Sequence, residues 1–99
     1  MTQIERIEKM ESILDKSTGA ISELAAAIEK YSALIGNITE LSKYYGSAEW
    51  ISDVDDSNNG KLPKDLKCGV LSEDAVYDLL TVNRTLAITM LEVATKILK

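Results

Sequence analysis

The chain has 99 residues, of which 45% are hydrophobic and 27% charged, and a formal net charge of −5, a composition typical of one small globular domain. It contains no histidine and a single cysteine, which excludes histidine-based catalytic triads, histidine-ligated metal sites and a disulfide within the chain. No apolar run reaches the roughly 18–20 residues needed to cross a bilayer, and the N-terminus lacks the apolar block of a signal peptide. We therefore expect a cytoplasmic protein without membrane attachment.

The first predicted element is a long helix over residues 3–35. Counted in sevens from Ile7, the first and fourth positions of the repeat are apolar at nine of ten places, and Ser17 is the exception. This spacing is typical of a coiled-coil seam. Because the phase is the same on both sides of Gly19, we expect the helix to continue through that glycine. The seam comprises Ile7, Leu14, Ile21, Ile28 and Ile35 at the first position, and Met10, Ser17, Leu24, Tyr31 and Ile38 at the fourth.

Shorter elements are predicted in the middle of the chain. Gly36-Asn37 is the expected end of the first helix, since glycine suits the left-handed position after a helix. Alternatively, the helix bends at Gly36 and continues to Tyr45. Gly46 ends the next segment, and Ser47 is positioned to cap another. The predicted elements are a helix over residues 37–45, a helix over 47–55, and a loop over 55–71 with Asn59-Gly60 and Pro63 as turn signals.

The last predicted helix covers residues 72–98 and has a clear start. Ser72 is the expected cap, and Glu73 and Asp74 fall in the first turn, where negative charge opposes the positive end of the helix dipole. Leu71 and Val76 have the spacing of a hydrophobic staple around the cap. An apolar stripe follows along the rest of the helix.

No segment alternates as a strand does, so the sequence predicts an all-α fold in a single domain over residues 1–99. We expect a long antiparallel helical hairpin with the short helices and the loop packed at one end, as in a small helical bundle. Two long helices alone bury little apolar surface. A homodimer is therefore predicted to complete the core.

The charge is concentrated in the middle of the chain. Residues 46–78 hold eight acids against three lysines, whereas the rest of the chain is balanced. An acidic surface disfavours direct binding to nucleic acid, because phosphates require basic groups, and favours a basic protein partner. Aromatic residues at 44, 45 and 50 are either an interface hot spot or core packing. The candidate partner-binding residues are Tyr44, Tyr45, Trp50, Asp53, Asp55, Asp56, Glu73, Asp74 and Asp78.

Part of a calcium-loop pattern starts at Asp55. Ser57 and Asn59 stand where further oxygen ligands belong, and Gly60 stands at the sharp turn. The position of the closing bidentate carboxylate is Leu66, which cannot bind a cation. Asp55, Ser57 and Asn59 are therefore weak metal candidates, and we expect no metal or other cofactor. Cys68 lies in the same loop without a histidine to act as its base, and we interpret it as an incidental cysteine.

Four blocks of the chain carry a family resemblance. They are RIEKMESILD, YYGSAEW, GKLPKDLK and GVLSEDAVYDLL, and together they resemble a family of small bacterial proteins catalogued as a domain of unknown function. The hallmark of that family is Leu-Ser-Glu-Asp, matched here by residues 71–74. Where the family pattern has a basic residue before Gly-Val-Leu, this chain has Cys68. The resemblance implies a single helical domain of bacterial or phage origin and supplies no activity.

These observations predict a non-enzymatic helical protein–protein interaction module with the acidic middle segment as its partner face. A bacterial or phage inhibitor of a basic nucleic-acid enzyme is one protein of this kind. The competing prediction is a divalent-ion-dependent enzyme or ligand binder that uses the carboxylates of residues 53–78. No residue is predicted to be catalytic.

Overall fold

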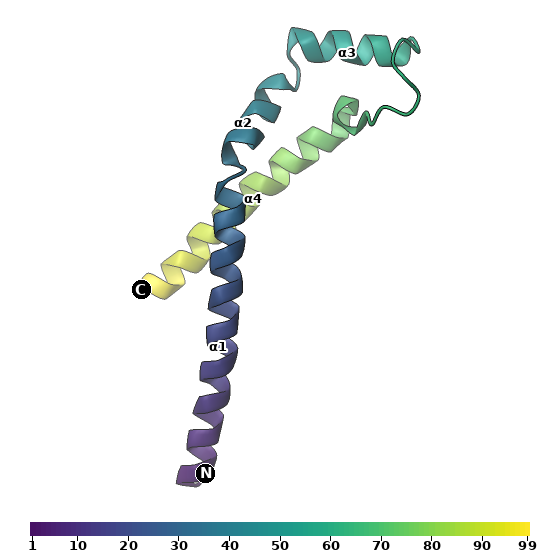
Figure 1. Ribbon diagram of the computed structural model, residues 1–99. Coiled ribbons are helices and arrows are strands. Elements are labelled where there is room, and N and C mark those ends of the chain that lie inside the picture. Colours follow the sequence, from purple (N-terminus) through teal and green to yellow (C-terminus); the bar gives the residue numbers. More distant parts are fainter. The chain divides into compact units, whose positions relative to one another are not determined.

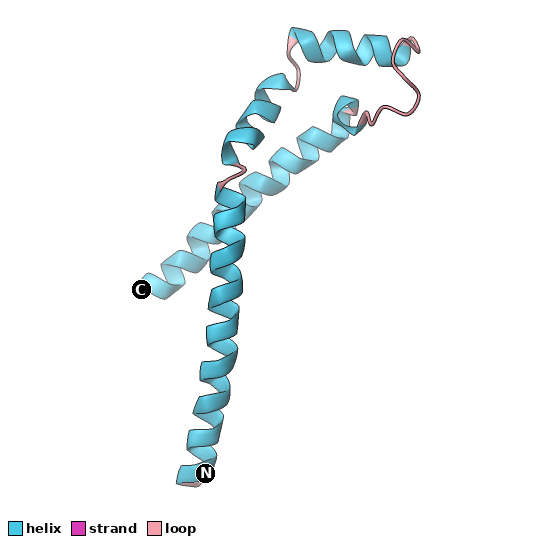
Figure 2. Ribbon diagram, viewed as in Figure 1, coloured by secondary structure: helices cyan, strands magenta, loops and turns pink.

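The computed structural model describes all residues from Met1 to Lys99, and every regular element is helical. The elements are the α-helices α1 (Gln3–Ser32), α2 (Ile35–Tyr44), α3 (Ala48–Asn58) and α4 (Glu73–Leu98), with the 3-10 helix η1 (Gly69–Leu71) before α4 (Figure 1). The absence of strands (Figure 2) confirms the all-α prediction. The chain divides into two compact units, Met1–Asn37 and Ile38–Lys99. None of its helices has an apolar stretch long enough to span a membrane.

α1 begins with a capping box formed by Thr2 and Glu5. The Thr2 backbone N–H donates to Oε1 of Glu5 at 3.1 Å, and the Glu5 backbone N–H donates to Oγ1 of Thr2 at 3.1 Å. Both bonds satisfy donors that a helix start leaves unpaired. The hydrogen bond from the Thr2 backbone is the main cause that lowers the pKa of Glu5, and the hydrogen bond with the Thr2 side chain is the second. Both favour the charged carboxylate. The prediction started the helix at the correct residue but did not recognise the Thr-x-x-Glu signature.

The end of α1 differs from the prediction. The helix runs through Gly19, as expected, but ends at Ser32 rather than at residue 35. The chain turns at Ala33 and Leu34, where the Leu34 N–H donates to the Tyr31 carbonyl at 2.9 Å and tightens the last turn. Gly36-Asn37, the predicted stop, lies inside α2. Gly36 does not have the positive φ of a glycine helix end, which only Gly46 and Gly60 adopt.

The corner between α2 and α3 follows the predicted signals. Gly46, with φ 79°, turns the chain after α2, and Oγ of Ser47 accepts from the Trp50 backbone N–H at 3.1 Å to cap α3. Both helices differ from their predicted ranges of 37–45 and 47–55, because α2 starts at Ile35 and α3 continues to Asn58.

Asn59-Gly60 is the stop signal of α3 rather than the turn of a metal-binding loop. Gly60 has φ 70°, its N–H donates to the Ser57 carbonyl at 3.2 Å, and the Lys61 N–H donates to the Asp56 carbonyl at 2.9 Å. This pair of bonds around a left-handed glycine is a Schellman motif. The loop therefore begins after the helix end at Asn58, and its predicted start at residue 55 was wrong.

α4 starts as the sequence predicts. Oγ of Ser72 accepts from the backbone N–H groups of Asp74 at 3.2 Å and Ala75 at 3.4 Å. Val76, the predicted staple residue, is 3% exposed and is the only buried residue of the Ile38–Lys99 unit. In the Met1–Asn37 unit no residue is buried. Neither unit therefore has an extensive core of its own.

Candidate interaction surface

Two of the three aromatic residues of YYGSAEW tie the α2–α3 corner to the start of α4. The rings of Tyr45 and Trp50 meet edge to face, with centroids 5.1 Å apart and planes at 66°. The Tyr45 hydroxyl donates to the Glu73 carbonyl at 2.8 Å, and Nε1 of Trp50 donates to the Val70 carbonyl at 3.1 Å. Both side chains are half-buried. Their polar atoms thus satisfy carbonyls of the segment that leads into α4.

Tyr44 forms the third link, within the corner itself. Its hydroxyl donates to Oδ2 of Asp53 at 2.5 Å. This hydrogen bond, followed by partial desolvation and by the charges of Asp53 and Glu49, raises the pKa of Tyr44 to about 12. The carboxylate stabilises the neutral phenol and repels the phenolate. Asp53, a predicted partner-binding residue, is consequently half-buried and engaged within the chain.

A shallow hollow of about 260 Å³ lies beside this bond. The hollow is smaller than most ligand pockets, and no histidine exists to activate the thiol of Cys68. The arrangement therefore lacks a thiol–imidazole pair, and the hollow is too small to enclose most substrates. The lining comprises Tyr44, Asp53, Leu62, Leu66, Lys67, Cys68, Val70 and Leu71.

The three weak metal candidates lie at the end of α3 rather than in a loop. Asp55 and Ser57 lie in the last turn of α3, and Asn59 is its C-cap. Two residues apart on a helix, the Asp55 and Ser57 side chains do not share a face, so they cannot converge on one ion as they do in an EF-hand loop. Nowhere in the chain do three carboxylate or thiol side chains gather closely enough to hold a metal ion.

The remaining predicted acids lie mainly on the surface. Asp55, Glu73, Asp74 and Asp78 are exposed, whereas Asp56 is half-buried. Asp56 approaches Lys61 at 4.0 Å, the only ion pair in the chain. Most of the negative charge of this segment is therefore uncompensated.

α1 presents an apolar face with nothing against it in its own unit. The first-position residues Ile7, Leu14, Ile21 and Ile28 are 52%, 58%, 68% and 47% exposed. The members of the predicted seam up to residue 31 lie on α1, whereas its last members, Ile35 and Ile38, lie on α2 because α1 ends at Ser32. A helix of this length needs its apolar face covered to be stable in water.

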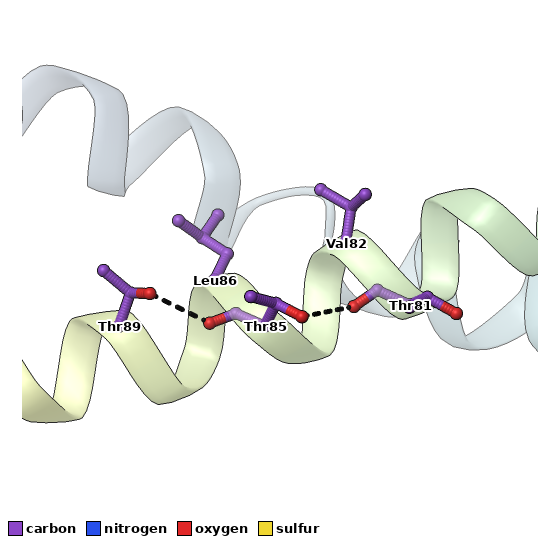
Figure 3. A pocket seen from close by; sticks show the side chains of 5 residues that line it. All are labelled: Thr81, Val82, Thr85, Leu86 and Thr89. Atoms are coloured by element: carbon purple, nitrogen blue, oxygen red, sulfur yellow. Dashed lines mark hydrogen bonds between the residues drawn. The ribbon is translucent and has the colours of Figure 1, made fainter.

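α4 carries a second apolar groove, and the threonines that line it were not part of the apolar stripe predicted for this helix. The Thr85 hydroxyl donates to the Thr81 carbonyl, and the Thr89 hydroxyl to the Thr85 carbonyl, both at 3.1 Å (Figure 3). These bonds occupy the hydroxyl hydrogens of Thr85 and Thr89, so these two threonines contribute methyl groups beside Val82 and Leu86 in a shallow groove of about 280 Å³. The signal in the sequence is threonine at every fourth residue from 81 to 89.

The fold and these surfaces define a small all-α protein with exposed apolar helix faces and an acidic corner. The chain belongs to the family described as a domain of unknown function, DUF4298, which matches residues 7–93. This match confirms the resemblance seen in the sequence. No curated protein and no solved structure matches the chain.

Proposed function

We propose that the protein is a non-enzymatic helical interaction module that forms a homodimer and presents its acidic middle segment to a basic protein. The observation that carries this proposal is the burial of a single residue, Val76, in a chain of 99. Large apolar side chains remain exposed along both α1 and α4. Contiguous exposed apolar surface of this kind marks interaction sites.

Two arrangements can cover the face of α1. In the predicted antiparallel hairpin, the stripe of α4 lies against α1 of the same chain, as in a small bundle. In a homodimer, a second copy supplies the partner helix. The pattern of residues along α1 favours the second copy.

Charge and helix electrostatics both support the acidic face. The last turn of α3 contains acids and no basic residue, although negative charge at a helix C-terminus opposes the dipole. Asp55 therefore lowers the local stability and is available to an external cation. A basic partner, such as an enzyme whose groove normally binds nucleic acid, would relieve this repulsion and bind in a salt-dependent way.

Titration with a polylysine peptide at low and high salt tests the acidic face. Neutralising three acids of the middle segment should weaken binding several-fold. As a control, neutralising three acids on the outer side of α1 changes the net charge by the same amount and should change the affinity less than twofold. Equal losses in the two variants, or an affinity independent of salt, would contradict the proposal. The test set is Asp55→Asn, Glu73→Gln and Asp78→Asn, and the control set is Glu8→Gln, Asp15→Asn and Glu29→Gln.

A further inference from the structure

We infer that α1 pairs with α1 of a second copy as a parallel, in-register two-stranded coiled coil. This inference rests on the homodimer of the proposed function and specifies its interface and the direction of its helices. Three features of α1 carry it: the residue types in the seam, the charges on its flanks and the polar residue at its centre.

The seam has the residue types of a parallel dimer. Its first position in α1 is isoleucine in three of four repeats, and its fourth position contains no β-branched residue. β-branched residues at the first position with leucine-like residues at the fourth favour two parallel strands. The first-position residues are Ile7, Leu14, Ile21 and Ile28, and the fourth-position residues are Met10, Ser17, Leu24 and Tyr31.

The two charges that flank the seam match only in a parallel pair. Arg6 precedes the first seam residue, and Glu11 follows Met10, so they occupy the two flanking positions of successive repeats. In a parallel coiled coil these positions face each other across the interface, and symmetry forms the pair between Arg6 and Glu11 twice. Neither side chain forms an ion pair within its own chain.

An antiparallel pair leaves both charges unmatched. Antiparallel helices bring like flanks together, and every other flanking residue of the seam in α1 is uncharged. Arg6 and Glu11 would then each face an apolar or small polar side chain. The other flanking residues are Ile4, Ile13, Thr18, Ala20, Ala25, Ala27 and Ser32.

Ser17 fixes the register. In a parallel in-register pair it lies level with Ser17 of the second copy, where the two hydroxyls can bond to each other or to the helix carbonyls. A shift by one repeat would set it against Met10 or Leu24, and burying a hydroxyl against an apolar side chain is unfavourable. A single polar residue in a seam specifies alignment in this way.

The exposed apolar surface of α1 is sufficient for a stable dimer. Eight large apolar side chains of α1 are between 47% and 68% exposed. At roughly 60–120 Å² for each side chain, their burial removes about 500–950 Å² per chain from water, close to the ~800 Å² per partner of a standard interface. They are Ile4, Ile7, Met10, Ile13, Leu14, Ile21, Leu24 and Ile28.

Cysteine cross-linking distinguishes the arrangements. In a full-length Cys68→Ser background, Met10→Cys places one thiol per chain in the seam, and Ser12→Cys places one on the opposite side of the same turn. The parallel dimer brings the two copies of residue 10 within disulfide reach, a Cα separation of ~4.4–6.8 Å. An antiparallel dimer in matching register separates them by about 27 Å. We expect a disulfide-linked dimer from Met10→Cys and none from Ser12→Cys under mild oxidation.

A charge-reversal cycle supplies an independent test that leaves the seam intact. Arg6→Glu or Glu11→Arg alone should raise the dimer Kd about tenfold, and the double variant should return it to within about threefold of wild type. Failure of both tests with a dimer still present overturns the parallel coiled coil and leaves the homodimer standing. If both tests fail and the protein is a monomer at every concentration, the coiled coil and the homodimer are both overturned. A chain in which α4 covers its own α1 would give that result.

Discussion

The hydroxyl of Tyr44, at the end of α2, donates a 2.5 Å hydrogen bond to Oδ2 of Asp53 on α3. The bond links two helices that are joined by a turn at Gly46, so it helps to hold the corner in shape. It also holds Tyr44 in its neutral form and raises its pKa from 10.0 to about 12. Because the interaction favours the neutral phenol, it makes the free energy of unfolding depend on pH in the alkaline range.

Tyr44→Phe should remove this pH dependence. Below pH 10 the tyrosine is neutral in both the folded and unfolded states, and its hydrogen bond contributes fully. Between pH 10 and about pH 12 the unfolded chain releases the proton while the folded chain retains it, so the free energy of unfolding falls. Urea unfolding in this interval should show a shallower decline for Tyr44→Phe than for wild type. Parallel declines would contradict the role assigned to the bond.

Trp50→Phe should destabilise the protein by about 1–3 kcal/mol. The substitution removes the donor to the part-buried Val70 carbonyl and the indole edge that meets Tyr45, and an unpaired acceptor with loss of an aromatic contact carries a penalty of about that size. Tyr77→Phe is the matched control, because Tyr77 is 61% exposed and its change should stay within about 0.5 kcal/mol. Denaturant unfolding followed by circular dichroism measures both. A loss for Trp50→Phe no larger than the control's would refute the anchoring role.

Ser72→Ala should lower the stability by about 1 kcal/mol, since it removes the cap of α4. The corresponding fall in melting temperature is about 4–8 °C for a chain of this length. Ser12→Ala, in the middle of α1 and exposed, should be neutral or slightly stabilising because alanine is the better helix former. Equal melting temperatures for the two variants would argue against the cap.

Two neutralisations on α3 should change the stability in opposite directions. Glu49 lies in the first turn of α3 and Asp55 in its last turn, so the dipole favours the first charge and disfavours the second. Glu49→Gln should lower, and Asp55→Asn raise, the free energy of unfolding by about 0.5 kcal/mol each at low salt. Thermal melts at low and high salt provide the comparison. Shifts of the same sign would show that the local dipole does not govern these charges.

Local signals predicted the fold well where one residue determines the outcome. Ser47 and Ser72 cap their helices, and Gly46 ends its segment, because each acts on backbone groups a few residues away. Gly36 misled the prediction, since glycine permits a helix end but does not require one. Asn59-Gly60 was recognised as a turn signal, but the pair alone does not show whether it lies within a loop, as predicted, or ends a helix, as it does for α3.

The corner could not be derived in the same way. Tyr45 and Glu73 are 28 residues apart, and their contact depends on how the intervening loop folds. The acidic residues were identified from composition, but composition does not show which of them bond within the chain. Asp53 bonds to Tyr44, whereas Asp55 is exposed. The apolar character of the α4 threonines depends on hydroxyls bonding to their own helix, which residue type does not reveal.

The mass of the protein in solution tests most directly whether a second copy covers the exposed faces. Light scattering across a dilution series should give twice 10.9 kDa at micromolar concentrations and should fall toward 10.9 kDa as the protein is diluted. A mass of 10.9 kDa at every concentration, with the helices intact by circular dichroism, would contradict the homodimer and the coiled coil built on it.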